Sequence, residues 1–236
     1  MNKQSNSYTI IYIIVLVIVM GAALAFTALS LKPQQTANAN ADKMKQILTS
    51  VNLTPAKDQV ISDFDRYITR QFIINSKGEE VDGNAFDVNV GNESKKPVDE
   101  RLLPVYECTL APGDVKYILP LYGAGLWGPI WGYISVNSDG STIYGAYFAH
   151  QGETPGLGAE IEKPAFSEQF EGLNLIKDNH FLPIAVMKAG QTPANGEDYV
   201  DAISGGTITS KGVESMISNC LSGYTVFLEN LTSKQE

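Results

Sequence analysis

The apolar segment near the N-terminus constrains this chain more than any other feature. Residues 8–31 read YTIIYIIVLVIVMGAALAFTALSL and contain no charged side chain. About 20 apolar residues span the hydrocarbon core of a bilayer, so this run predicts a transmembrane helix. A cleavable signal peptide is the alternative, because small residues follow at 36–41 (TANANA). The apolar core of a signal peptide is usually only about 7–15 residues long, which favours an anchor that stays attached.

The charges beside this segment indicate its orientation only weakly. Lys3 precedes the apolar run and Lys32 follows it directly, so the positive-inside rule hardly separates the two orientations. A short polar N-terminus ahead of a large domain is compatible with residues 1–7 in the cytoplasm. We therefore expect the rest of the chain to lie on the outer side of the membrane.

Composition excludes several classes of protein. The chain has 236 residues with a formal net charge of −9, which argues against nucleic-acid binding because that function needs a basic surface. Its two cysteines, Cys108 and Cys220, form no C-x-x-C pair, so neither a zinc ribbon nor a thioredoxin-type site is expected. A disulfide between them and two buried free thiols both remain open.

The first part of the outer segment reads as a linker followed by helices. Residues 31–43 are polar and predict a linker, whereas residues 41–52 and 57–70 carry apolar side chains at helical spacing. A short strand is expected over 71–75, and the polar, glycine-containing residues 76–100 predict irregular structure. We thus divide the chain into a cytoplasmic N-terminus (1–7), a transmembrane helix (8–31), a linker with a helical or irregular part (32–100) and a main domain (101–236).

The main domain is expected to be an antiparallel sheet flanked by helices. Its first half contains runs of aromatic and β-branched residues separated by short turn signals, which favour antiparallel hairpins, over 104–110, 115–122, 130–137 and 142–150. A short helix over 163–173, a strand over 181–188 and a helix after 211 follow. The fold class is therefore α+β.

Two local patterns give only weak functional signals. Residues 123–128 (GAGLWG) match G-x-G-x-x-G, but Pro129 and a strand-like run follow where a dinucleotide site requires a helix, so we expect a hairpin loop. His150 lies three residues before Glu153 and could serve as a general base. A packed or hydrogen-bonded histidine is the simpler interpretation.

Two glycine-rich segments give stronger signals. Residues 153–158 (ETPGLG) form a loop whose backbone could approach a ligand closely, although a tight connection after a strand is the simpler alternative. Residues 201–210 (DAISGGTITS) precede a predicted helix, where backbone amides favour anions such as phosphate. A helix cap alone needs one hydroxyl rather than several together with two glycines. This second segment therefore suggests that the side chain of Thr207 is accessible to another molecule.

These two segments resemble the signatures of FMN-binding domains. Residues 201–207 (DAISGGT) resemble the motif D-x-x-[ST]-G-A-[ST] for covalent FMN attachment, and residues 153–158 resemble the second signature of that family. Together with a single N-terminal anchor, they make the chain similar to the family of C subunits of Na⁺-translocating NADH:quinone reductases. The family of G subunits of ion-translocating ferredoxin:NAD⁺ oxidoreductases, and an anchored binding module without redox function, are the alternatives.

The resemblance implies specific roles for individual residues. Thr207 would carry FMN as a phosphoester on its hydroxyl, and Asp201 would be read by a flavin transferase that takes FMN from FAD. Other residues would surround the cofactor: Ser204, Gly205 and Gly206 at the attachment loop, and Glu153, Thr154, Gly156, Leu157 and Gly158 near the flavin ring or ribityl chain. Gly206 departs from the family, which usually has alanine there, and we expect attachment to tolerate it.

The resemblance also implies a function within a complex. The protein would pass electrons from NADH toward a ubiquinone-type quinone, coupled to Na⁺ export, with no catalytic acid, base or metal of its own. Its partners would be the other membrane subunits and, during maturation, the transferase. Its place would be the bacterial inner membrane, with the soluble domain on the periplasmic side.

Overall fold

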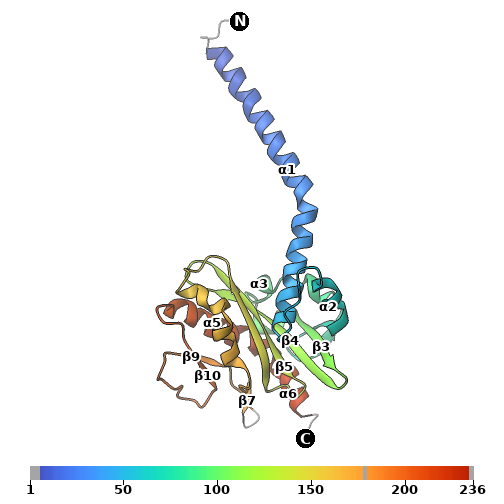
Figure 1. Ribbon diagram of the computed structural model, residues 1–236, viewed down its shortest axis with the longest axis vertical. Coiled ribbons are helices and arrows are strands. Elements are labelled where there is room, and N and C mark those ends of the chain that lie inside the picture. The colour runs from blue at the N-terminus through green and yellow to red at the C-terminus, as the bar shows by residue number, and fades with distance from the viewer. Residues whose placement is uncertain (1–5, 178–179, 234–236) are drawn as a thin grey trace. The chain divides into compact units, whose positions relative to one another are not determined.

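The computed structural model describes residues 6–177 and 180–233 (Figure 1), so Lys3 lies outside the described residues. The chain divides into two compact units, residues 1–43 and residues 44–236. The first unit consists of helix α1 (Asn6–Thr49) up to residue 43, and the last turns of α1 belong to the second unit. Among the described residues, α1 is the one helix long and apolar enough to cross a membrane.

Helix α1 continues where the sequence predicts a linker. It passes through Pro33 and the polar residues 34–43 without a break. Proline removes one backbone hydrogen bond and disfavours a helix interior, but Ala37, Ala39 and Ala41 follow, and alanine has the highest helix propensity. The polar character of this segment therefore marks the end of its apolar surface and not the end of the helix.

The second unit is built on a six-stranded antiparallel sheet with the strand order β2-β1-β3-β4-β5-β6. Its strands are β1 (Ile68–Ile74), β2 (Glu80–Val81), β3 (Leu103–Ala111), β4 (Asp114–Ala124), β5 (Pro129–Asn137) and β6 (Ile143–His150). The four runs predicted as strands in the first half of the main domain are thus confirmed as β3 to β6. Strand β1 joins the same sheet, so residues 44–100 contribute to one compact unit with the main domain.

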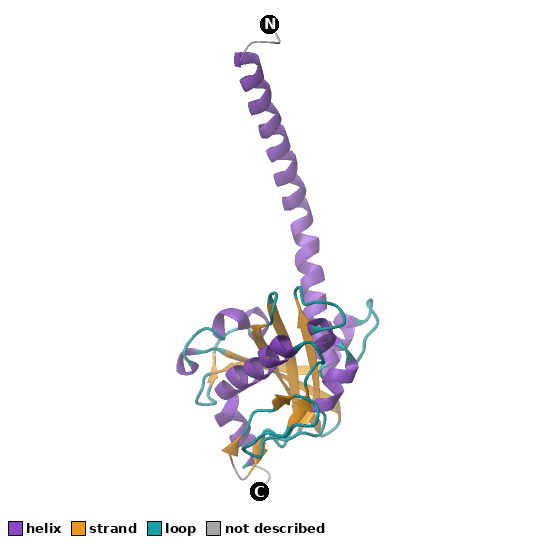
Figure 2. Cartoon of the chain, turned by 90° about the vertical axis from the view of Figure 1, so that its left-hand side faces the viewer, coloured by secondary structure: helices purple, strands orange, loops and turns teal. Residues whose placement is uncertain are grey.

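The sheet separates two hydrophobic cores, and Figure 2 shows its strands with helices on either side. One face packs against the end of α1 and against α2 (Val60–Tyr67), with Ile47, Leu48 and Phe64 buried there. The other face packs against the C-terminal helices. Side chains of a strand alternate between the faces, as Phe72 and Ile73 do in β1.

The two cysteines lie on opposite faces of this sheet. Cys108 belongs to the core beside α1 and α2, and Cys220 to the core beside the C-terminal helices. Both are buried and both are free thiols. Of the two possibilities that the sequence left open, the structure therefore shows the free thiols.

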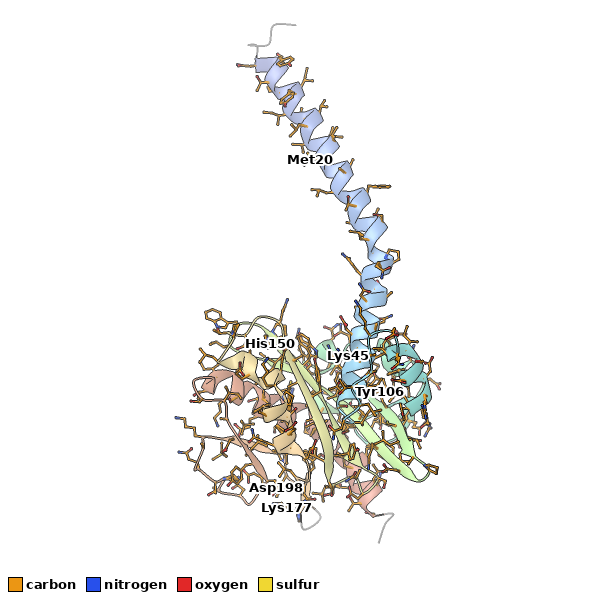
Figure 3. All side chains as sticks on the ribbon, in the orientation of Figure 1. Met20, Lys45, Tyr106, His150, Lys177 and Asp198 are labelled. Atoms are coloured by element: carbon orange, nitrogen blue, oxygen red, sulfur yellow. The ribbon has the colours of Figure 1, made fainter. Side chains whose placement is uncertain are left out.

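The remaining elements are short, apart from helix α5. They are α3 (Val90–Glu93), α4 (Pro164–Ser167), β7 (Ile176–Lys177), β8 (His180–Phe181), β9 (Ala185–Met187), β10 (Tyr199–Asp201), α5 (Thr207–Leu221), α6 (Thr225–Thr232) and the 3₁₀ turns η1 (Ala85–Asp87), η2 (Val98–Glu100), η3 (Gly158–Glu162), η4 (Glu168–Phe170) and η5 (Ser222–Tyr224). An ion pair between Lys177 Nζ and Asp198 Oδ1 (2.7 Å) joins β7 to the segment before β10 (Figure 3).

Two predicted elements are shorter in the structure. The helix expected over 57–70 is α2, and its last predicted residues form the start of β1. The strand expected over 181–188 is interrupted, because Pro183 cannot donate to a strand ladder, and only Phe181 in β8 and residues 185–187 in β9 are extended pairs. The helix predicted after 211 begins four residues earlier, at Thr207.

Candidate functional site

The segment between β10 and α5, residues 202–206, is a short turn that leads directly into the helix. Strand β10 pairs in parallel with β9 and ends at Asp201, and α5 begins at Thr207. Within the loop the amide of Gly206 donates to the carbonyl of Ile203 (3.0 Å), and the amide of Ile203 donates to Ser210 Oγ (3.0 Å). These bonds hold the loop so that Ser204, Gly205 and Thr207 remain exposed.

Gly206, which departs from the family motif, occupies a tight place. A Cβ atom at this position would lie 3.1 Å from the Cβ and Cγ2 atoms of Ile203 and 3.3 Å from the amide nitrogen of Gly158. Such contacts are shorter than ordinary van der Waals distances, so alanine would fit only if its neighbours moved by a few tenths of an ångström. Glycine therefore suits this loop without that adjustment.

The two predicted motifs lie against each other in the fold. The backbone of Gly158 faces Gly206, and the side chain of Leu157 occupies the space in front of Gly205. Thr154, Gly156 and Leu157 are exposed, whereas Gly158 is buried. Segments about fifty residues apart in sequence thus form one surface around Thr207.

Glu153 differs from its neighbours in being buried, with only 4% of its surface exposed. Its Oε2 accepts a hydrogen bond from Thr209 Oγ1 (2.6 Å), and its Oε1 accepts one from the backbone amide of Trp127 (2.8 Å). Both carboxylate oxygens are therefore engaged by the protein. Thr209 and Trp127 were not predicted as site residues, since no sequence pattern pairs them with Glu153.

His150 is a packed residue within this network. It ends β6, is labelled in Figure 3, and its Nδ1 accepts a hydrogen bond from the backbone amide of Glu153 (3.1 Å). Its Nε2 lies 3.8 Å from Glu162 Oε1. With Nδ1 used as an acceptor, His150 helps to orient the loop that carries Glu153.

Two hollows lie beside the 202–206 segment. A smaller one, of about 140 Å³, is lined by Thr207, Lys188, Lys211 and Gln191 among others. A larger one, of about 340 Å³, is lined by Asp201, Ser204, Gly156 and Lys163 among others. The 202–206 segment therefore has open space on two sides.

Exposed apolar side chains lie around the same 202–206 segment. Ile208 is 58% exposed and follows Thr207, Leu157 is 42% exposed, and Trp127 in the β4–β5 loop is 69% exposed. The predicted hairpin loop is confirmed over residues 125–128, closed by a hydrogen bond from the Gly125 amide to the Gly128 carbonyl (2.8 Å), whereas residues 123 and 124 belong to the end of β4. Solvent-exposed tryptophan and aliphatic side chains beside a motif indicate a surface that another molecule covers.

These residues fit an FMN bound through its phosphate. The hydroxyl of Thr207 is exposed at the start of a 15-residue helix, where backbone amides without partners in the helix favour a phosphate. Lys188 and Lys211 line the hollow beside it. Leu157 and Trp127 offer apolar surface of the kind that planar aromatic ligands contact. Among residues 6–177 and 180–233, no three acidic, histidine or cysteine side chains converge as a metal site would require.

Comparisons with known proteins identify relatives of this chain. Residues 125–222 match the model of the FMN-binding domain family. The C subunit of the Na⁺-translocating NADH-quinone reductase of Vibrio vulnificus is 33% identical, over 90% of this chain and 89% of that protein, and its Yersinia pestis counterpart is 31% identical, over 98% and 94%.

Solved structures extend the agreement to the fold. The crystal structure of the C subunit from Parabacteroides distasonis superposes with a TM-score of 0.79 at 48% identity, covering 84% of this chain and 96% of that one. The structure of NqrC from Shewanella oneidensis gives a TM-score of 0.69 at 24% identity, which shows the shared fold. The chain therefore belongs to the family of C subunits of the Na⁺-translocating NADH-quinone reductase, FMN-binding members of a membrane oxidoreductase complex.

Proposed function

We propose that this protein carries FMN covalently on Thr207 and passes electrons within a Na⁺-translocating NADH:quinone reductase. The observation that carries the proposal is the exposed hydroxyl of Thr207 at the start of α5, in a loop that lies against residues 153–158. The hydroxyl side chain, the phosphate-favouring helix start and the apolar surface are the three parts that a phosphate-linked flavin requires. Thr207 is the member of the loop that both fits the motif and begins the helix.

Attachment requires a transferase, and its chemistry balances with FAD as the donor. A bond forms between Thr207 Oγ and the phosphorus of the FMN half, while the phosphorus–oxygen bond of the FAD diphosphate breaks. AMP leaves, and the hydroxyl proton passes to solvent or to a base of the transferase. Asp201 is exposed at the end of β10, as recognition by a second protein demands.

In the assembled complex the flavin supplies redox chemistry, and the protein supplies position and environment. The chain contributes a rigid sheet, a tethering hydroxyl and apolar side chains around it. A covalent tether prevents loss of the cofactor on a membrane side where free FMN would diffuse away. We infer that α1 anchors the protein in the bacterial inner membrane, with the domain on the periplasmic side, and that the other subunits of the complex are its partners.

The test is in-gel flavin fluorescence of the full-length chain after denaturation, with and without co-expression of a flavin transferase. We expect a fluorescent band for the wild-type chain with the transferase, and an intact mass that is larger by one FMN ester. Thr207→Ala should abolish both signals, while Thr225→Ala, which makes the same replacement at the first residue of α6, should retain the covalent flavin. Equal fluorescence in wild type and Thr207→Ala would contradict attachment at Thr207.

The alternative is a function in the ferredoxin:NAD⁺ oxidoreductase complex, which has a similar FMN-binding subunit. Membership of the quinone reductase family favours the first function. NADH-dependent quinone reduction by membranes that contain the assembled complex is expected to fall when Thr207 is replaced by alanine. Unchanged quinone reduction, with loss of a ferredoxin-dependent activity instead, would support the alternative.

A further inference from the structure

The carboxylate of Glu153 connects three separate parts of the site. It lies in the loop that follows β6, its Oε2 accepts from Thr209 in the first turn of α5, and its Oε1 accepts from Trp127 in the β4–β5 loop. Thr209 is two residues after Thr207. One buried side chain therefore fastens the helix that begins with Thr207 to the loops on either side.

The backbone around this carboxylate is shaped to fit it. A Cβ atom at Gly125 would collide with Glu153 Oε1, and a Cβ atom at Gly158 would collide with both Glu153 Oε2 and Thr209 Oγ1. Two glycines on different segments thus let backbone approach the two oxygens closely. Any side chain at either position would push the carboxylate out of its place.

Neutral groups hold the carboxylate of Glu153. Among the described residues, the ion pairs of Lys and Arg side chains involve other carboxylates. The oxygens of Glu153 instead accept from a hydroxyl and a backbone amide. Loss of either donor would leave a buried oxygen without a hydrogen bond, which costs free energy.

We propose that Glu153 is a positioning residue for the flavin site: it holds the first turn of α5, and with it Thr207, in place. The positioning itself concerns the protein alone, whereas its importance for the flavin rests on the proposed FMN site at Thr207.

Hydrogen exchange in the full-length chain without flavin tests the positioning role. The amide of Ser210 donates to the carbonyl of Gly206 (2.9 Å), so its exchange reports opening of the first turn of α5. Glu153→Ala and Thr209→Val should each speed this exchange on the order of tenfold, because each leaves a buried polar group without its partner. Glu153→Gln should restore slow exchange, since the side-chain amide keeps a polar partner for both Trp127 and Thr209.

Wild-type exchange at Ser210 in both Glu153→Ala and Thr209→Val would overturn the positioning role. Far-UV circular dichroism identifies a variant that fails to fold. If the wild-type chain takes up no FMN on Thr207, the proposed function fails, but the exchange measurement still decides the positioning role.

Discussion

At the scale of single residues, the two thiols are chemically inert for a structural reason. Burial raises the pKa of Cys108 to about 12, with the charge of Asp114 adding to the effect. Burial also raises the pKa of Cys220, whose Sγ lies 3.3 Å from the Tyr122 amide nitrogen. Since the thiolate is the reactive species, both side chains remain protonated across the ordinary pH range.

We therefore predict that thiol reagents do not modify the native full-length chain at mildly alkaline pH. Both cysteines should react once the chain is unfolded in guanidinium, which a mass spectrum would show as two adducts. Lys188→Cys, at an exposed position, provides the positive control in the native state. Rapid modification of Cys108 or Cys220 without denaturant would contradict this account.

The residues of the site were predictable only where their types form a motif. The sequence indicated Thr207, its glycine neighbours and residues 153–158, and the structure brings these segments together. The sequence contained no sign of a role for Thr209, because the hydrogen bond from this residue to Glu153 joins positions 56 residues apart. The burial of Glu153 likewise depends on packing that a motif does not describe.

At the scale of elements, the last turns of α1 are part of the domain core. Ile47 and Leu48 in α1, and Val51 just after its end, are almost fully buried. Trp131 Nε1 in β5 donates to Gln46 Oε1 (3.0 Å), and the hydroxyl of Ser135 donates to the carbonyl of Ser50. The apolar helix and the soluble fold therefore share one continuous stretch of chain.

Two truncations should separate the two roles of α1, as an apolar helix and as part of the domain core. A chain that starts at residue 42 should fold as a soluble domain, whereas one that starts at residue 52 should lose several kcal/mol of stability. Burial of each such side chain contributes roughly 1.5–3 kcal/mol, and the second truncation removes three of them. Urea unfolding followed by circular dichroism would measure the difference, and equal midpoints for the two chains would disprove it.

Helix and strand predictions succeeded where a pattern matched one buried face. Strands β3 to β6 have long apolar runs because both of their faces are covered, and they were predicted nearly to their ends. The polar residues 31–43 were predicted as a linker because a helix without a buried face shows no periodicity. Short pairs such as β7–β8 depend on tertiary contacts and have too few residues to form a pattern.

At the scale of the whole molecule, the chain combines an apolar helix with an acidic soluble domain. Its net charge of −9 keeps the domain soluble. The proposed arrangement places this domain outside the cytoplasm, which suits free thiols only if they are protected, as burial on opposite faces of the sheet protects them. Labelling of single introduced cysteines can measure on which side of the membrane the domain lies.

We predict that a membrane-impermeant maleimide labels Lys188→Cys in spheroplasts without lysis. Asn6→Cys, on the other side of the apolar run, should be labelled only after the membrane is opened. The native cysteines do not interfere because both are buried. The reverse pattern of labelling would place the domain in the cytoplasm.

The order of strands in the sheet also determines when the fold can form during synthesis. From β4 to β6 each strand pairs with the one made just before it, so the sheet can grow by hairpins as successive strands become available. Helix α5, with Thr207, is made after all six strands. The residue proposed to receive the cofactor is therefore among the last to find its place, and a chain that stalls earlier presents no folded acceptor.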